Sequence, residues 1–152
     1  MKINLIVIGL LKDGPEHDLI QKYSKRLQWK LNIKQLVVKK NLNGAELKTA
    51  EANLIRAALI PGAPLVALDE RGQNLTSEQF ARKVQKFEVN GVSDLNFCIG
   101  GAQGLDETLR MQAEWLISFG ALTWPHMLVR GMLLEQLYRA QQILAGHPYH
   151  KV

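Results

Sequence analysis

A short apolar run at residues 95–99 is followed within five residues by three glycines, Gly100, Gly101 and Gly104. Glycines at the end of a strand let a ligand approach the backbone and leave amide N–H groups free to bind it. The spacing, Gly-Gly-x-x-Gly, is neither the dinucleotide motif Gly-x-Gly-x-x-Gly nor a phosphate loop. The turn has no lysine, and Asp106 and Glu107 follow it where they would repel a pyrophosphate. The motif therefore predicts a ligand that is bound by backbone groups with its adenine in an apolar slot. The alternative is a tight turn without a ligand.

Other chemistries are disfavoured by what the sequence contains. Cys98 is the only cysteine, so a disulfide or a cysteine-rich metal site within one chain is excluded, and it lies in an apolar strand where it should pack as a small hydrophobe. No serine lies in a Gly-x-Ser-x-Gly turn. His147 and His150 are three residues apart, but Pro148 lies between them and no carboxylate is close in sequence, so we expect no metal.

The carboxyl-terminal region contains the remaining reactive side chains. Arg130 and Arg139 are nine residues apart on a predicted helix, which is about 900° of rotation, so they should point to opposite faces. The two arginines can serve one pocket only if a second chain contributes. The tail 146–150 reads Gly-His-Pro-Tyr-His, whose aromatic rings could stack on an unpaired base. The alternative reading of the tail is a frayed chain end.

Strand-like and helix-like segments alternate five times along the chain. Apolar runs predict strands, and segments of helical periodicity predict helices. The strands are expected at 2–9, 31–40, 65–69, 95–99 and 117–123; the helices at 15–30, 44–60, 76–90, from 106 to about 115, and 126–145. Continuous rather than alternating apolar strands predict an α/β fold with a mainly parallel sheet covered by helices on both faces. We expect one domain, 1–152.

The ligand should lie outside the carboxyl ends of the strands in such a fold. Three segments follow predicted strands and should share this edge: the polar loop 70–73 with Asp69, the glycine turn 100–104, and the segment 119–124. Three such segments on one rim indicate a ligand site more strongly than the glycines alone.

The charge is unevenly distributed. The net charge is +5, with +6 on residues 1–60 and −1 on residues 61–152. A basic half favours an anionic partner, although a solvated basic surface would give the same pattern. No signal peptide and no apolar run long enough to cross a bilayer is visible, so we expect a cytoplasmic protein without a membrane partner.

Four segments together resemble a known family: Ile99–Leu105, Ala121–Arg130, Glu135–Ala140 and His147–His150. The chain resembles, over nearly its whole length, the small ribosomal large-subunit pseudouridine N3-methyltransferases of the SPOUT, or trefoil-knot, class. Two positions depart from that family's usual pattern. Gly-Gly-Ala-Gln-Gly replaces Gly-Gly-Pro-Glu-Gly, so Gln103 removes an acid, and Met127 replaces the second proline of Pro-His-Pro.

The resemblance implies a homodimer with a knotted carboxyl-terminal part, which the general rule against knots would not predict. It implies S-adenosylmethionine as methyl donor and, by position, a cofactor site formed by Leu68, Gly100, Phe119, Gly120, Ala121, Leu122, Thr123 and Trp124. The implied substrate is N3 of a pseudouridine in a hairpin loop of 23S rRNA, within the assembled ribosome.

We expect His126 near the reacting atoms, and RNA contacts from Arg130, Tyr138, Arg139, His147, Tyr149 and His150. His150 or His147 is the candidate general base, because only histidine normally titrates near neutral pH. Two alternatives remain open: an RNA- or ribosome-binding protein that has lost catalysis, and a knotted methyltransferase that acts on tRNA.

Overall fold

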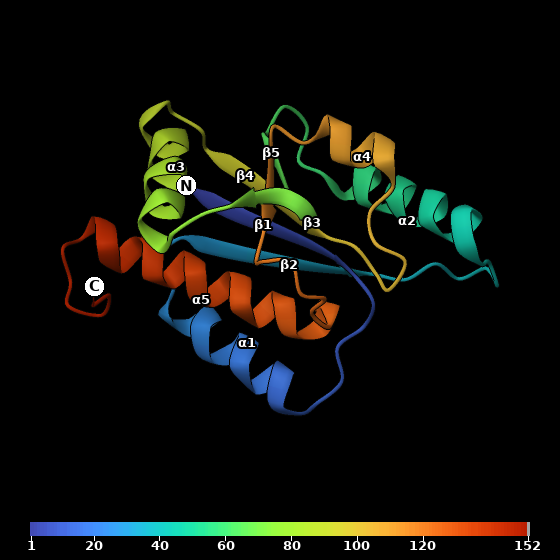
Figure 1. Cartoon of the computed structure of the whole chain (residues 1–152), viewed down its shortest axis with the longest axis horizontal. Helices are drawn as coiled ribbons and strands as arrows, with labels where there is room; N and C mark the ends of the chain where they lie inside the picture. The colour runs from blue at the N-terminus through green and yellow to red at the C-terminus, as the bar shows by residue number, and fades with distance from the viewer. Residues whose placement is uncertain (152) are drawn as a thin grey trace.

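The computed structural model describes residues 1–151, in which five strands alternate with five helices (Figure 1). The order along the chain is β1 (Lys2–Ile8), α1 (Pro15–Arg26), β2 (Lys30–Leu36), α2 (Gly44–Ala58), β3 (Leu65–Asn74), α3 (Ser77–Val89), β4 (Asp94–Ile99), α4 (Glu107–Gln112), β5 (Trp115–Ser118) and α5 (His126–Leu144). The predicted α/β class and the alternation of elements are confirmed.

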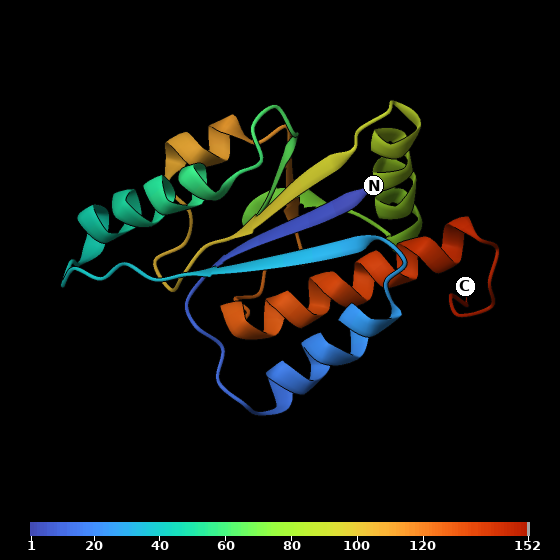
Figure 2. The ribbon, with the colours of Figure 1, turned by 180° about the vertical axis from the view of Figure 1, so that it is seen from behind.

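The five strands form one sheet in the order β2-β1-β4-β3-β5, and every neighbouring pair is parallel. Helices α1, α3 and α5 cover one face and α2 and α4 cover the other, as the view from behind also shows (Figure 2). Alternate residues of β1 face the two layers: Leu5 packs on the α1, α3 and α5 side, and Ile6 on the α2 and α4 side. Burial on both faces explains the continuous apolar strands.

Cys98 lies on β4 in the layer beneath α2 and is fully buried. Burial raises the pKa of its thiol to about 12, because the charged thiolate loses its hydration. The thiol therefore stays protonated and packs as a small hydrophobe, as the sequence predicts.

The strand that follows α4 differs from expectation. Trp115, expected on a helix, begins β5, and this strand ends at Ser118 rather than at Thr123. The indole of Trp115 is buried against Phe80 and Phe87, with ring centroids 5.4 and 6.4 Å apart. The apolar periodicity of this segment therefore reflects packing on α3 rather than a longer helix. Two strands also end at other residues than expected. β2 ends at Leu36 rather than at residue 40, and β3 begins at Leu65 as expected but continues to Asn74.

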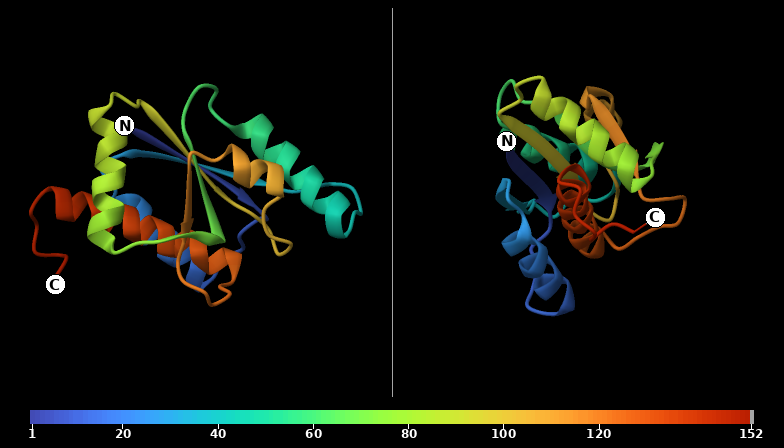
Figure 3. Two further views of the ribbon diagram at one scale, coloured as in Figure 1. Left: turned by 45° about the horizontal axis from the view of Figure 1, so that its top comes forward. Right: turned by 90° about the vertical axis from the view of Figure 1, so that its left-hand side faces the viewer.

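The expected polar loop 70–73 is the second half of β3, and this correction concerns the most unusual contact of the fold. Leu68 and Gln73 both pair with Ile117 of β5, so β3 changes register as it passes this strand. A Cβ atom on Gly72 would lie 2.5 Å from the Ile117 backbone, so only glycine allows the crossing. The view in Figure 3 shows β3 crossing the shorter strand before it leads to α3. Polar residues that normally indicate a loop are thus held in a strand by this crossing.

Local sequence determines where α3 begins and how closely α5 packs on α1. Thr76 and Gln79 form the predicted capping box at the start of α3, each side chain binding the backbone N–H of the other residue. In α5, a Cβ atom on Gly131 would lie 2.4 Å from Leu19 Cδ2, so this glycine allows close packing on α1.

Within residues 1–151, none of the helices combines the length and the apolar character that crossing a membrane would require.

Candidate cofactor and nucleic-acid sites

A cavity of about 600 Å³ opens at the carboxyl ends of β3, β4 and β5. The segments that line it are those expected to share one rim: Leu68 to Arg71, Ile99 to Leu105, and Ile117 to Gly120 with Leu122 to His126 and Val129. Seven of the eight residues assigned to the cofactor by resemblance line the cavity, and Ala121 is the exception. Lys48 of α2, which sequence reasoning did not identify, completes the wall.

The glycine turn is shaped by contacts that leave no room for side chains. The backbone N–H of Gly104 donates to the Gly101 carbonyl at 3.0 Å, and Gly104 has a φ of 76°. A Cβ atom on Gly100 would lie 3.0 Å from the Gly104 backbone, and one on Gly101 would lie 3.0 Å from Glu51 Oε1. The turn therefore folds back on itself and brings backbone groups, rather than side chains, to the cavity.

Glu51 supports this turn from beneath and was not identified from the sequence. Its side chain is 7% exposed on α2, and within the described residues its Oε2 has no hydrogen-bond partner. Burial raises the pKa of its carboxyl group, which favours the neutral acid. A single glutamate in an alanine-rich helix carries no signal in the sequence that separates it from a solvated surface residue.

Asp106 holds the far end of the turn. Its carboxylate caps α4 by accepting hydrogen bonds from the Thr108 hydroxyl and from the N–H groups of Thr108 and Leu109, and Arg56 lies 3.7 Å away. The Thr108 hydrogen bond is the largest cause of a lowered pKa of Asp106. The acid after the glycines is thus a helix cap, which the sequence placed one residue inside the helix.

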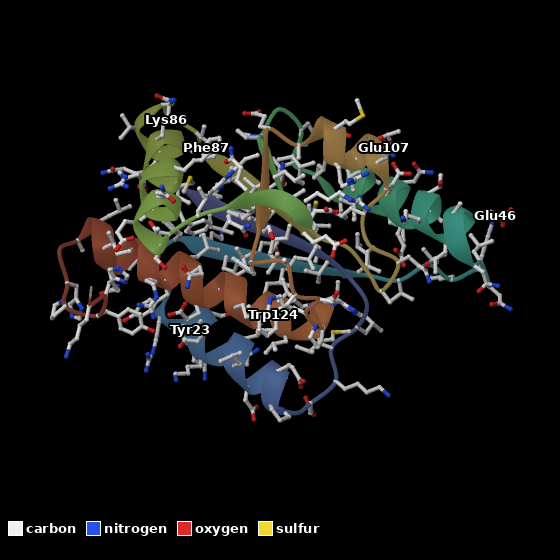
Figure 4. All side chains as sticks on the ribbon, viewed as in Figure 1. Tyr23, Glu46, Lys86, Phe87, Glu107 and Trp124 are labelled. Carbon is white, nitrogen blue, oxygen red and sulfur yellow. The ribbon has the colours of Figure 1, made fainter. Side chains whose placement is uncertain are left out.

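The segment after β5 forms the opposite wall. The Ser118 hydroxyl donates to the Gly120 carbonyl at 2.9 Å and accepts from the Gly120 N–H at 3.1 Å. The indole N–H of Trp124 donates to the Phe119 carbonyl at 3.2 Å. Leu122 is 72% exposed and Trp124 is 40% exposed, and Figure 4 shows Trp124 near the start of α5. Two exposed apolar side chains at a cavity mouth favour contact with a ligand or partner.

His126 begins α5 and lines the cavity, as expected for a residue near the reacting atoms. Burial lowers the pKa of its imidazole, and the charge of Arg130 one turn along lowers it further. The ring is therefore kept neutral at physiological pH.

Arg130 is placed differently from the RNA contact that we expected. Its side chain is 1% exposed, and its guanidinium donates to the carbonyls of Ile8 at 2.7 Å and Gly9 at 3.0 Å. A third hydrogen bond, at 3.3 Å, reaches Gln35 Oε1. As placed here the side chain binds the end of β1 and presents no group to RNA.

The other candidate RNA contacts gather at the opposite end of α5. Glu135 Oε1 accepts from Arg139 Nη2 at 2.6 Å and from the Tyr149 hydroxyl at 3.1 Å. His150 lies between Arg139 Nη1, at 3.2 Å, and Glu78 Oε1, at 2.6 Å. Tyr138 meets the Tyr149 ring edge-on, with centroids 4.8 Å apart. The cluster of Arg139, Tyr138 and the tail confirms that Arg130 and Arg139 face different surroundings.

None of the tail residues up to Lys151 lines the cavity of its own chain. His147 is exposed, and its Nδ1 accepts from the Tyr149 N–H at 3.1 Å. Sequence reasoning did not identify Glu135 and Glu78 as the partners of this cluster. The four-residue spacing of Glu135 and Arg139 is the signal that could have revealed the first.

A second cavity, of about 630 Å³, lies between α1, α3 and α5. It shares residues 117–120 with the first cavity, so one short segment forms a wall of both. Among residues 1–151, no group of three or more His, Cys, Asp or Glu side chains is arranged to hold a metal ion.

Comparison with known proteins identifies the family to which the chain belongs. A family model described as "Predicted SPOUT methyltransferase" matches residues 1–150. Proteins named "Ribosomal RNA large subunit methyltransferase H" are 54% identical in Rhodospirillum centenum, over 99% of both chains, and 50% identical in Dinoroseobacter shibae, over all of both chains. The chain therefore belongs to the SPOUT methyltransferase family.

Two solved structures share the fold at low sequence identity. A probable methylase family protein from Haemophilus influenzae has a TM-score of 0.53 and 12% identity, and the match covers 99% of this chain and 70% of that one. A tRNA (m1G37) methyltransferase from Aquifex aeolicus has a TM-score of 0.53 and 13% identity, over 100% and 76%. These similarities concern the fold alone, and the fold class implied by the family resemblance is confirmed.

Proposed function

We propose that this chain transfers a methyl group from S-adenosylmethionine to N3 of a pseudouridine in a hairpin loop of 23S rRNA, on the assembled ribosome and in the cytoplasm. The observation that carries the proposal is the glycine-walled cavity at the carboxyl ends of β3, β4 and β5. Full-length relatives named for methylation of large-subunit ribosomal RNA support the choice of substrate.

The residues around the cavity suit a cationic methyl donor. Most of the wall is backbone or apolar, and the glycine turn carries no lysine. Asp69 and Glu70 place carboxylates on the rim and Lys48 and Arg71 place cations there, so the lining has no excess of positive charge that would favour a phosphate. S-adenosylmethionine, when bound, supplies an activated methyl group, and residues 100–104 and 119–124 would hold it.

The chain must align the uracil ring with the methyl group and help N3 lose its proton. Leu122 and Trp124 offer exposed apolar surface at the mouth, where a base can stack. The neutral His126 can accept a proton or a hydrogen bond there without adding positive charge next to the donor. His150, one of the two candidate bases, lies with Arg139 and Glu78 instead, and the other candidate, His147, is exposed and does not line the cavity.

We also propose that the active form is a homodimer in which the tail of one copy serves the cavity of the other. The placement of Arg139, Tyr149 and His150 away from their own cavity supports this arrangement. The second cavity, which shares the wall 117–120, is a suitable seat for the other copy. Light scattering of the purified protein tests the assembly.

The deciding experiment measures transfer of radiolabelled methyl groups to purified ribosomes, to naked rRNA and to tRNA. Label only on the large-subunit rRNA of ribosomes is the expected result. Label on tRNA would replace the substrate, and an absence of cofactor binding would leave an RNA-binding protein as the remaining reading. Deletion from His147 onward should preserve cofactor binding and abolish transfer.

A further inference from the structure

Arg130 is one of the largest fully buried side chains of the described residues, and its hydrogen-bond partners are all neutral. Ile8 is the last residue of β1, Gly9 follows it directly, and Gln35 is near the end of β2. Gln35 Oε1 also accepts from the Leu11 N–H at 2.7 Å. A buried guanidinium is costly unless its donors are used. Here Nη1 and Nη2 have acceptors, and Nε has none within the described residues.

The guanidinium joins the end of β1 to the first turn of α5. Gly9 has a φ of 101° and lies directly against that turn. A Cβ atom there would lie 3.0 Å from Met127 Cε, 3.4 Å from Arg130 Nη2 and 3.5 Å from His126 Nε2. Three residues of α5 therefore meet one glycine, and the Arg130 hydrogen bonds fix how they meet it.

Two residues of this turn line the cavity, His126 and Val129, and His126 is the one with a titratable side chain. The other charged residues that line the cavity are Lys48, Asp69, Glu70 and Arg71. Any movement of α5 relative to β1 would move the imidazole relative to these groups and to the segment 119–124 that precedes it. The orientation of the imidazole thus depends on a contact made one helical turn away.

We infer that Arg130 is a positioning residue for methyl transfer: it fixes the first turn of α5 on the end of β1 and thereby sets where the His126 imidazole stands at the rim of the cavity. This inference rests on the proposed function, and it replaces the RNA contact that the sequence suggested for Arg130. After burial, the charge of Arg130 is the second cause of the lowered pKa of His126, which adds an electrostatic role to the geometric one.

The test compares the variants Arg130→Met and Arg130→Lys with Arg82→Met, which changes an exposed arginine of α3. Three quantities are measured: affinity for S-adenosylmethionine, the single-turnover rate of transfer to ribosomes, and the NMR titration of His126, assigned with the variant His126→Gln. For Arg130→Met we expect a rate at least about tenfold lower, because a small misplacement at a reacting centre is costly. Cofactor affinity should change by less than about threefold, since the cavity walls remain.

The His126 titration separates positioning from mere loss of stability. Arg130→Met should raise the pKa of His126, because a neighbouring positive charge is removed. Arg130→Lys keeps the charge but loses the fork of donors, so the pKa of His126 should stay low while the rate falls to an intermediate value.

A folded Arg130→Met protein with an unchanged rate and an unchanged His126 titration would overturn the inference, even if its stability had dropped. Failure of the wild-type protein to bind S-adenosylmethionine would overturn the proposed function instead. The His126 titration needs neither cofactor nor RNA, so it decides the contact between Arg130 and His126 in either case.

Discussion

Each end of α5 carries an arginine, and the two arginines are bound by different kinds of partner. Arg130 is buried, and backbone carbonyls of another element accept its hydrogen bonds. Arg139 is partly accessible, and the side chains of Glu135 and His150 bind it. The first arrangement fixes one part of the fold on another, and the second can rearrange by side-chain rotation. The comparison teaches that the same residue type on one helix can join two elements of the fold at one end and remain partly accessible at the other.

The largest expected effect is on the free energy of unfolding, when Arg130 and Arg139 are each replaced by methionine in separate variants. Arg130→Met should lower the free energy of unfolding by about 2–4 kcal/mol, because two buried carbonyls lose their donors. Arg139→Met should cost only about 0.5–1 kcal/mol, as is usual for accessible ion pairs. Urea denaturation of both variants measures the difference. Equal losses would mean that the two ends are held alike.

Only part of this contrast could be predicted from the sequence. The nine-residue spacing predicts that Arg130 and Arg139 face different surroundings, and apolar runs predict the strands. The three rim segments follow from the rule that parallel strands place ligands at their carboxyl ends. Burial of Arg130 was not predictable, because two of its partners are backbone carbonyls more than 100 positions away. The extension of β3 through 70–73 was missed for a similar reason, since pairing with β5 overrides the polar composition.

A smaller effect is expected from Glu135→Gln, which weakens the acceptor shared by Arg139 and Tyr149. The change should cost about 1 kcal/mol or less. Amide hydrogen exchange should become faster in residues 146–150 and remain unchanged in the first turns of α5. Glu46→Gln, at an exposed position of α2, is the matched control. Faster exchange at both ends of α5 would show that they are not independent.

The smallest effect concerns pH and the pair formed by His150 and Glu78. The His150 hydrogen bond is the largest cause of a pKa of Glu78 lowered from 4.5 to about 2. Because the folded-state pKa is the lower one, the stabilisation is present above pH 4.5 and is lost as the pH falls toward 2. The effect is modest, since water reaches both side chains.

NMR titration of the Glu78 carboxyl group measures this directly. His150→Ala should return the pKa of Glu78 toward 4.5, and His17→Ala, which changes the histidine of α1, should leave it unchanged. A pKa of Glu78 that does not change when His150 is replaced would mean that the tail is not held at this point.

The approach of β3 to β5 at Gly72 imposes an order on how the chain assembles. The backbones of β3 and β5 come so close at Gly72 that not even a methyl group fits between them. No other segment of the chain can therefore pass between the two strands once they pair. In a knotted chain, the segment that leads to α5 must therefore be threaded before β3 closes over Ile117. Such a threading step is not needed in an unknotted fold. The closure of β3 over β5, two of the strands that bound the cavity, should consequently be a late step of folding, and the binding site should mature with it.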